Sequence, residues 1–280
     1  MNWSEITVFD LATNPVYNHP EFVTHSNYVH AMKEMSDNIS LTITNITANN
    51  LQEPVILRKK LNLIKLTLDN IIEEKRNIDI LHDYSLICVS WIPVKSYYLL
   101  FNLLIILEFF INDSPDWFDS RHIELCNKFR NQLHDGTISF NNPELNLCFT
   151  ANTILSWQIP RSENLRGGSH NPEIRKQQII KKIYEYKKED YKRNNKIKKL
   201  GGKKLVDFKN RTQICLFDFF YWYRIKANYR DMEFIDNGVP IEEFYQFYTD
   251  YFNLTINYYQ ALKTLLNQLS VQKLRRSIIN

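Results

Sequence analysis

The sequence predicts an all-α fold, a helical bundle with one small β-hairpin and a protruding basic helix. Apolar residues recur at spacings of three, four and seven over several long segments, as on the buried face of an amphipathic helix. Glycine and proline are few, six and nine among 280 residues, and most of them lie between these segments. The charge is also segregated: residues 161–211 hold 17 Lys and Arg against six Asp and Glu, whereas the rest of the chain holds 18 against 25.

These patterns divide the chain into four parts. Residues 1–24 contain two X-Pro steps and are expected to form an extended N-terminal arm with room for one short helix. Residues 25–160 are predicted to form a helical bundle that ends in the hairpin. Residues 161–211 form the basic helical arm, and residues 212–280 supply aromatic-rich C-terminal helices that pack on the bundle.

Two amphipathic helices are expected first in the bundle. The first begins near Asn27 and carries Met32, Met35, Ile39, Ile43 and Ile46 at helical spacing. The second follows Pro54 and places Leu57, Leu61, Ile64, Leu68 and Ile71 on one face.

The most apolar segment, residues 97–111, is predicted to be a buried central helix that begins near Trp91-Ile92-Pro93. It is shorter than the roughly 20 residues that a membrane span needs. Ser114-Pro115-Asp116 has the cap, proline and acid of a helix start, and Asp135-Gly136 suits the end of that helix. Alternating apolar residues in 137–150, on either side of Asn141-Asn142-Pro143, predict the hairpin.

The cysteines, Cys88, Cys126, Cys148 and Cys215, form no C-x-x-C pair and lie in apolar stretches. This pattern is typical of buried, reduced thiols. Neither a metal nor another cofactor is predicted, because no ligand spacing fits and the glycine-rich phosphate-binding motifs are absent. The N-terminus shows no basic region followed by an apolar core, so a cytoplasmic protein without membrane contact is expected.

A set of Arg and His pairs could carry chemistry. Arg130 and His134 are four residues apart near the end of a predicted helix, so both should lie on one helix face, with Asn131 beside Arg130. Arg76 and His82 form a second pair with wider spacing. For either pair the alternative is structural, a histidine at a helix end that bonds a carboxylate or carbonyl.

With these Arg-Asn…His motifs, residues 27–136 resemble the HEPN superfamily of helical proteins in prokaryotic defence and toxin systems. The resemblance implies a metal-independent RNA endonuclease with Arg130, Asn131 and His134 as catalytic residues. It also implies a homodimer, whose two motifs meet at a cleft, and a protein partner encoded nearby. In such a site a histidine moves the proton of a ribose hydroxyl, and an arginine binds the phosphate as charge builds.

The basic arm supplies the predicted nucleic-acid contacts. Tyrosines interleave with its cations, so phosphate binding with some base stacking is expected from Lys181, Lys182, Lys187, Lys188, Lys192 and Arg193. The alternative is a lysine-rich helix that is simply solvated. For the whole chain, the HEPN-like ribonuclease is the first hypothesis. A non-catalytic nucleic-acid-binding or scaffold protein of the same fold is the second, and a protein that binds an acidic partner is the third.

Overall fold

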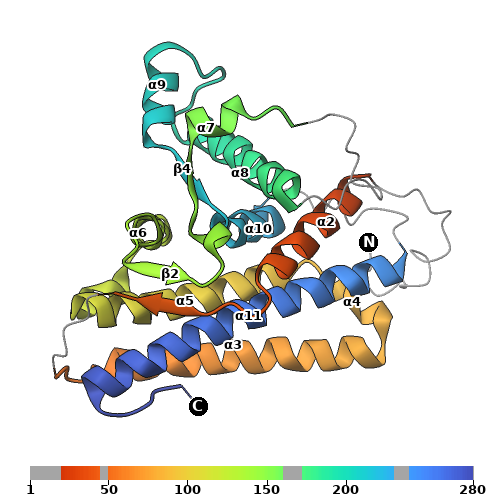
Figure 1. The fold of residues 1–280 in the computed structure, drawn as a ribbon. Coiled ribbons are helices and arrows are strands. Elements are labelled where there is room, and N and C mark those ends of the chain that lie inside the picture. Colours follow the sequence, from red (N-terminus) through yellow and green to blue (C-terminus); the bar gives the residue numbers. More distant parts are fainter. Residues whose placement is uncertain (1–19, 45–49, 160–171, 230–239, 280) are drawn as a thin grey trace.

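A computed structural model describes residues 20–44, 50–159, 172–229 and 240–279, and it confirms the all-α fold class (Figure 1). Most of the predicted N-terminal arm and residues 161–171 of the predicted basic arm lie outside the described residues. The first helix begins before Asn27, because α2 (Pro20–Met35) includes the last residues of the predicted arm.

Three long helices, α3 (Val55–Ile80), α5 (Ile92–Asn112) and α11 (Ile241–Leu274), run along one another on one side of the molecule (Figure 1). One of the three, α5, is the predicted central helix. α5 contacts α3, α10 (Asp218–Tyr229) and α11, and is therefore buried nearly all round. Among the described residues it is the one helix long and apolar enough to cross a membrane, but 78% of its apolar window is buried in the protein.

The second predicted helix is confirmed as α3. Its buried residues, Leu57, Ile64, Ile71 and Ile78, recur every seven residues and face the core. A short 3-10 turn, η1 (His82–Tyr84), and the single helical turn α4 (Ser85–Cys88) connect α3 to α5.

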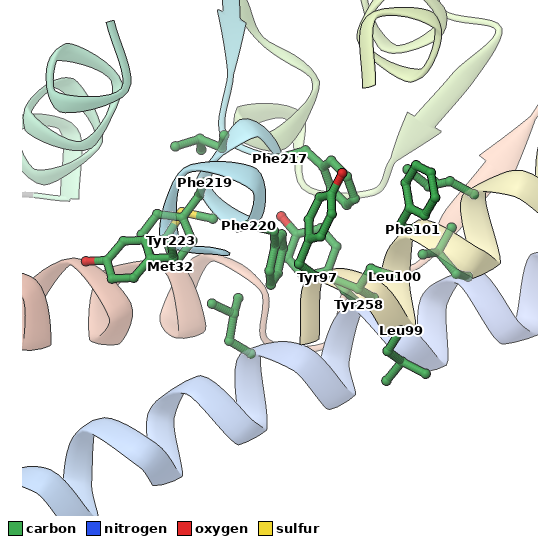
Figure 2. Packing of buried hydrophobic residues seen from close by; sticks show 14 of the residues in the cluster. Met32, Tyr97, Leu99, Leu100, Phe101, Phe217, Phe219, Phe220, Tyr223 and Tyr258 are labelled. Atoms are coloured by element: carbon green, nitrogen blue, oxygen red, sulfur yellow. The ribbon is translucent and has the colours of Figure 1, made fainter. Parts of the chain in front are cut away.

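Aromatic side chains fill the space between α5, α10 and α11 (Figure 2). Phe220 and Tyr258 meet edge to face at 5.0 Å between ring centroids, and Phe219 lies 4.2 Å from Tyr223. Tyr258 and Tyr223 are almost completely buried. Such pairs add to the free energy of burial, so the aromatic C-terminal segment packs on the bundle as its composition suggests.

The first predicted helix ends earlier than its apolar spacing implies. α2 stops at Met35, and Asn38 adopts a left-handed φ of 57°, which redirects the chain into strand β1 (Leu41–Ile43). The Ser36 hydroxyl donates to the carbonyl of Lys33 and helps to end the helix. The β-branched residues beyond this point favour a strand, so the helical reading through Ile43 is wrong.

The predicted β-structure forms at the expected residues, but its strands pair with distant partners. β2 (Ile138–Phe140) pairs antiparallel with β1, and β3 (Cys148–Thr150) pairs antiparallel with β4 (Gln213–Cys215). A 3-10 turn, η3 (Pro143–Asn146), separates β2 from β3. The Asn146 side chain bonds both the N–H and the C=O of Phe140, at 2.7 and 2.9 Å, and so fixes the turn that sends the strands apart.

The predicted cap at Ser114 forms, but it begins a 3-10 helix and not the α-helix that was expected. The Ser114 hydroxyl accepts from the N–H of Asp116 at 3.2 Å and caps a 3-10 helix, η2 (Pro115–Asp119). The α-helix itself, α6 (His122–His134), begins later. It ends at Asp135, followed by Gly136 with φ 75°, as predicted.

The basic segment forms α8 (Pro172–Asn194) and α9 (Gly202–Arg211), which lie with α7 (Ala151–Ser156) on the side away from α3 (Figure 1). α8 is docked along one face against α2, α7, α10 and β4. Its apolar stripe, Ile179, Ile180, Ile183 and Tyr184, is buried.

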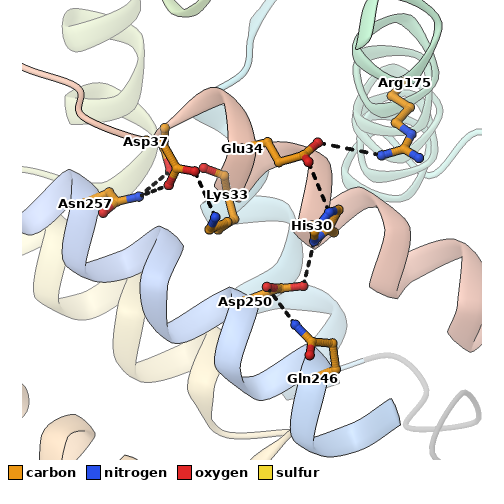
Figure 3. Close-up of polar contacts among 9 residues, drawn as sticks. His30, Lys33, Glu34, Asp37, Arg175, Gln246, Asp250 and Asn257 are labelled. Carbon is orange, nitrogen blue, oxygen red and sulfur yellow. Dashed lines mark hydrogen bonds and ion pairs between the residues drawn. The ribbon is translucent and has the colours of Figure 1, made fainter. Parts of the chain in front are cut away.

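A polar seam joins α2, α8 and α11 (Figure 3). His30 lies between Glu34 and the buried carboxylate of Asp250, at 3.2 and 3.0 Å. Glu34 also reaches Arg175 of α8 at 3.8 Å. These contacts fix the orientation of α8 on the bundle, so we assign the seam a structural role.

Candidate functional site

A cavity of about 280 Å³ lies between α6, α8, α9 and α10. It combines three kinds of side chain: a charged floor, an aromatic wall and a rim of amides. All four helices must be in place for it to exist, and three of them come from the basic and aromatic segments that follow residue 171.

The floor centres on Asp218, the first residue of α10. Arg130 of α6 donates two hydrogen bonds to its carboxylate, from Nε at 3.2 Å and from Nη2 at 2.6 Å. Lys187 of α8 places Nζ 3.1 Å from the same carboxylate, and the N–H of Cys215 donates to it at 3.0 Å. Two cations therefore share one carboxylate, which leaves the floor with a net positive charge.

Burial alone would raise the pKa of Asp218, but the adjacent charges of Arg130 and Lys187 and the hydrogen bonds outweigh it and lower that pKa to about 2. Burial and repulsion from Arg130 lower the pKa of Lys187, although Asp218 acts in the opposite direction. The carboxylate is therefore ionised at neutral pH, and the floor is an ionic cluster.

The aromatic wall consists of Tyr186 and Phe208, which are buried, and Tyr191 and Tyr221, which are half-buried. Tyr191 packs against Phe208 with 5.1 Å between ring centroids, and its hydroxyl donates to Asp207 at 3.1 Å. The amides of the rim are Asn127, Asn194, Asn195 and Gln213. Flat apolar faces next to amide donors and acceptors suit a planar, polar-edged ligand.

A group of exposed cations lies at the end of α8, in the following turn and at the start of α9, and two of them directly flank the rim residues Asn194 and Asn195 in the chain. We call this group the basic tip; it comprises Arg193, Lys196, Lys198, Lys199, Lys203 and Lys204. Of the nearby carboxylates, Glu189 and Asp207 pair with Lys192 and Arg211, at 2.7 Å each, and Asp190, which lines the cavity, accepts a hydrogen bond from the amide of Asn194 at 3.1 Å. Within the described ranges, no ion pair involves a residue of the basic tip.

The structure distributes the predicted nucleic-acid contacts over different surroundings. Arg193 belongs to the basic tip, Lys188 is partly exposed and Lys192 pairs with Glu189. Lys181 and Lys182 border a separate shallow hollow beside Tyr28. Lys187 is half-buried, and its ammonium is already engaged by Asp218 and the carbonyl of Gln213 in the cavity floor.

The predicted catalytic residues do not converge within one protomer. Arg130 is buried and bonds Asp218, and its Nη1 also donates to Asn127 at 2.9 Å. Asn131 and His134 are exposed and lie outside the cavity. Side chains four residues apart are neighbours on a helix surface, but Arg130 turns inward to Asp218, whereas His134, the last residue of α6, is exposed to solvent.

The second pair is not assembled either. Arg76 reaches Glu73 at 3.4 Å on the surface of α3. His82 bonds Glu242 of α11 at 3.0 Å and stacks on Tyr245 with 3.9 Å between ring centroids. His82 therefore has the structural partners, a carboxylate and a ring, that the alternative interpretation expects.

The residue that sequence reasoning missed is Asp218. Its signal was present, since an aspartate inside the run Phe217-Asp218-Phe219-Phe220 must either turn outward or find buried cationic partners. In the described part of the chain, no cluster of three or more His, Cys, Asp or Glu side chains is placed to hold a metal ion.

No protein-family model, curated protein or solved structure matches this chain. The resemblance to the HEPN superfamily therefore stays a prediction, and the function must be argued from the site.

Proposed function

We propose that this protein binds single-stranded RNA, with the basic tip on the phosphates and one base in the cavity. The observation that carries the proposal is the adjacency of the two features. Asn194 and Asn195 line the cavity and lie between Arg193 and Lys196 of the basic tip in the chain. The proposal corresponds to the second hypothesis from the sequence, a non-catalytic nucleic-acid-binding protein, and adds a specific binding site to it.

The basic tip suits phosphate groups. Its cations are exposed and have no carboxylate partner among the described residues, so binding an anion breaks no existing ion pair. Neutralising phosphates with such side chains releases condensed counterions, which favours binding and makes it depend on salt.

The cavity suits a base. Every nucleobase offers two π-faces, and stacking on an aromatic side chain contributes about 1–3 kcal/mol per base. Tyr191 and Tyr221 present partly exposed rings, and the amides of Asn127 and Gln213 can bond a base edge. Unstacked bases of this kind are available in single-stranded RNA and are hidden inside a duplex.

The same geometry favours binding over cleavage by Arg130. The guanidinium already makes three hydrogen bonds, two to Asp218 and one to Asn127. A phosphate would have to displace the buried carboxylate of Asp218 from Arg130, which would remove one of the two cations that balance this buried charge. Arg130 therefore acts in this proposal by holding α6 to α10.

The test is fluorescence anisotropy with a labelled single-stranded RNA over a series of salt concentrations. The double variant Lys198→Glu/Lys199→Glu should weaken binding at least tenfold and reduce the slope of log K against log salt by about 1.4, since each phosphate contributes about 0.7. The matched control is Lys59→Glu/Lys65→Glu, which reverses two exposed lysines on α3. Equal effects of the two variants would overturn the proposal.

The same samples test the catalytic hypothesis. With excess EDTA, the RNA should remain intact over the course of the titration. RNA cleavage that persists in EDTA and disappears in His134→Ala would replace the binding proposal with the HEPN-like ribonuclease.

A further inference from the structure

Two cysteines from distant parts of the chain face each other across the β3–β4 ladder. Cys148 and Cys215 are directly opposite in the antiparallel register. Residues opposite each other in such a ladder point to the same side of the sheet, with Cβ atoms about 4.5–5.5 Å apart, and closer in a non-hydrogen-bonded pair.

The surrounding hydrogen bonds identify this as a non-hydrogen-bonded pair. The N–H of Cys215 donates to Asp218, and the carbonyl of Gln213 accepts from Lys187. Both groups therefore point away from β3, and the alternation of an antiparallel ladder then makes Ile214 and its partner Phe149 the hydrogen-bonded pair. Opposite residues at a non-hydrogen-bonded position have Cα atoms about 4.5 Å apart, within the range of about 4.4–6.8 Å that a disulfide spans.

We propose that Cys148 and Cys215 are a reversible oxidation site and form an intramolecular disulfide when the protein meets a peroxide. This inference is independent of RNA binding. In the reduced state both are free thiols, and Cys148 Sγ donates to the carbonyl of Arg130 at 3.5 Å. Only small side-chain movements are needed, because opposite residues at such a position have backbones at a separation that a disulfide spans.

The reaction proceeds in two steps. The Cys148 thiolate attacks one oxygen of hydrogen peroxide, the O–O bond breaks, and Cys148 sulfenic acid and hydroxide form. The Cys215 sulfur then attacks the Cys148 sulfur, the S–O bond breaks, and the proton of the Cys215 thiol leaves with the hydroxyl as water. Two thiols and one peroxide thus give one disulfide and two waters, and an added dithiol reverses the change.

The two cysteines have different access to the oxidant. Cys148 is half-buried, whereas only 2% of Cys215 is exposed. A hydrogen bond from the Cys215 thiol, together with the charge of Arg130, lowers the pKa of Cys148 despite partial burial. The pKa of Cys215 is raised by the same hydrogen bond and by burial, so Cys148 meets peroxide first and Cys215 resolves the sulfenic acid.

The other two cysteines serve as internal controls. Burial raises the pKa of Cys126 to about 11, and burial and the charge of Glu74 raise that of Cys88 to about 11. Neither of them lies in a described strand, and neither has a cysteine opposite it.

The experiment treats the reduced full-length protein with hydrogen peroxide, blocks the remaining thiols with N-ethylmaleimide in denaturant and measures the intact mass. Two of the four thiols should escape the label, the protein should lose two hydrogen atoms, and dithiothreitol should restore both thiols. Peptide mapping should join the peptide of Cys148 to that of Cys215.

Cys148→Ser and Cys215→Ala should each abolish the cross-link, while Cys126→Ser should retain it. Cys148→Ser is the informative variant should the buried Cys215→Ala fail to fold, because Cys148 is half-buried. Four labelled thiols after a treatment that oxidises free glutathione would overturn the proposal. A cross-link that involves Cys126 or Cys88, or Cys148 oxidised to the sulfinic acid without a cross-link, would overturn it equally.

Discussion

Two buried carboxyl groups show how the two halves of the molecule differ. Glu108 lies one turn before the end of α5, beside Asn112 and near Gln132 and Lys128 of α6, and burial raises its pKa. Asp218 lies in the cavity floor, where Arg130 and Lys187 overcome burial and lower its pKa to about 2. Burial is the dominant influence on the pKa of Glu108, whose hydrogen-bond partners are amides, whereas two cations in the cavity floor keep the carboxylate of Asp218 ionised. Stable charge at the base of an aromatic cavity is what distinguishes the candidate site from the core.

The largest effect is expected from a charge placed where the long helices provide no partner. Leu103 of α5 is fully buried, so Leu103→Asp should unfold the protein, because a buried carboxylate without a partner is too costly to retain. The matched control is Leu66→Asp on α3, where the side chain is 68% exposed. Circular dichroism and solubility separate the two, and a folded, soluble Leu103→Asp would refute the central position of α5.

The next effect concerns the ionised floor itself. Asp218→Asn leaves the buried Arg130 and the half-buried Lys187 without their counter-charge, which should reduce the free energy of unfolding by about 3–5 kcal/mol. Asp69→Asn, at an exposed position on α3, should change it by less than about 0.5 kcal/mol. Urea denaturation measures both, and similar values for the two variants would show that the floor is not a tight ionic cluster.

The pH dependence of the free energy of unfolding is a second test of the difference between Asp218 and Glu108. The pKa of Asp218 is depressed on folding, so its stabilisation is fully present above about pH 4, the unfolded value, and is lost as the pH falls through about 2. In Asp218→Asn the free energy of unfolding should therefore change less as the pH falls below about 4.

The pKa of Glu108 is raised on folding, so its favourable contribution to stability is instead lost as the pH rises above about 4. Glu108→Gln should remove this loss of stability above about pH 4 and leave the loss at lower pH, which Asp218 causes, unchanged.

The sequence predicts the core better than the site, for a physical reason. The apolar periodicity of α3 and the nearly continuous apolar run of α5 are local properties, and both helices formed as expected. The strand partners at Leu41–Ile43 and Gln213–Cys215 depend on the tertiary arrangement, which no local pattern encodes.

The site depends on such non-local contacts to a still greater degree. Arg130 was singled out because of His134, four residues away, yet its partner is Asp218, 88 residues along the chain. Helical periodicity could say that Arg130 was near the apolar stripe, but it could not say which charge would meet it.

A moderate effect is expected from the aromatic wall. Tyr191→Ala should weaken binding of single-stranded RNA roughly 10- to 100-fold, since it removes a stacking surface, and should leave duplex affinity unchanged. The control is Tyr245→Ala, because Tyr245 is also half-buried and its hydroxyl also donates to an aspartate at 3.1 Å, but it lies on α11.

Comparison with the variant of the basic tip separates the two parts of the proposed site. Lys198→Glu/Lys199→Glu should weaken binding of single-stranded and duplex RNA alike, because both present phosphates. If the lysine variant weakens binding and Tyr191→Ala does not, the phosphate surface stands and the base cavity fails.

The smallest effect on stability is expected at the histidines of the two predicted catalytic pairs. His134 is exposed at the end of α6, so His134→Ala should change the free energy of unfolding by less than about 0.5 kcal/mol. His82 bonds Glu242 and stacks on Tyr245, and thereby connects η1 to α11. His82→Ala should therefore cost more than His134→Ala, about 0.5–1.5 kcal/mol. Urea denaturation measures the two values, and RNA binding should be unchanged in both variants because neither residue lies in the cavity or the basic tip. A His134→Ala variant that folds normally yet loses an RNA-dependent activity would separate function from stability at this position. That result would move the functional centre from the cavity to the exposed end of α6.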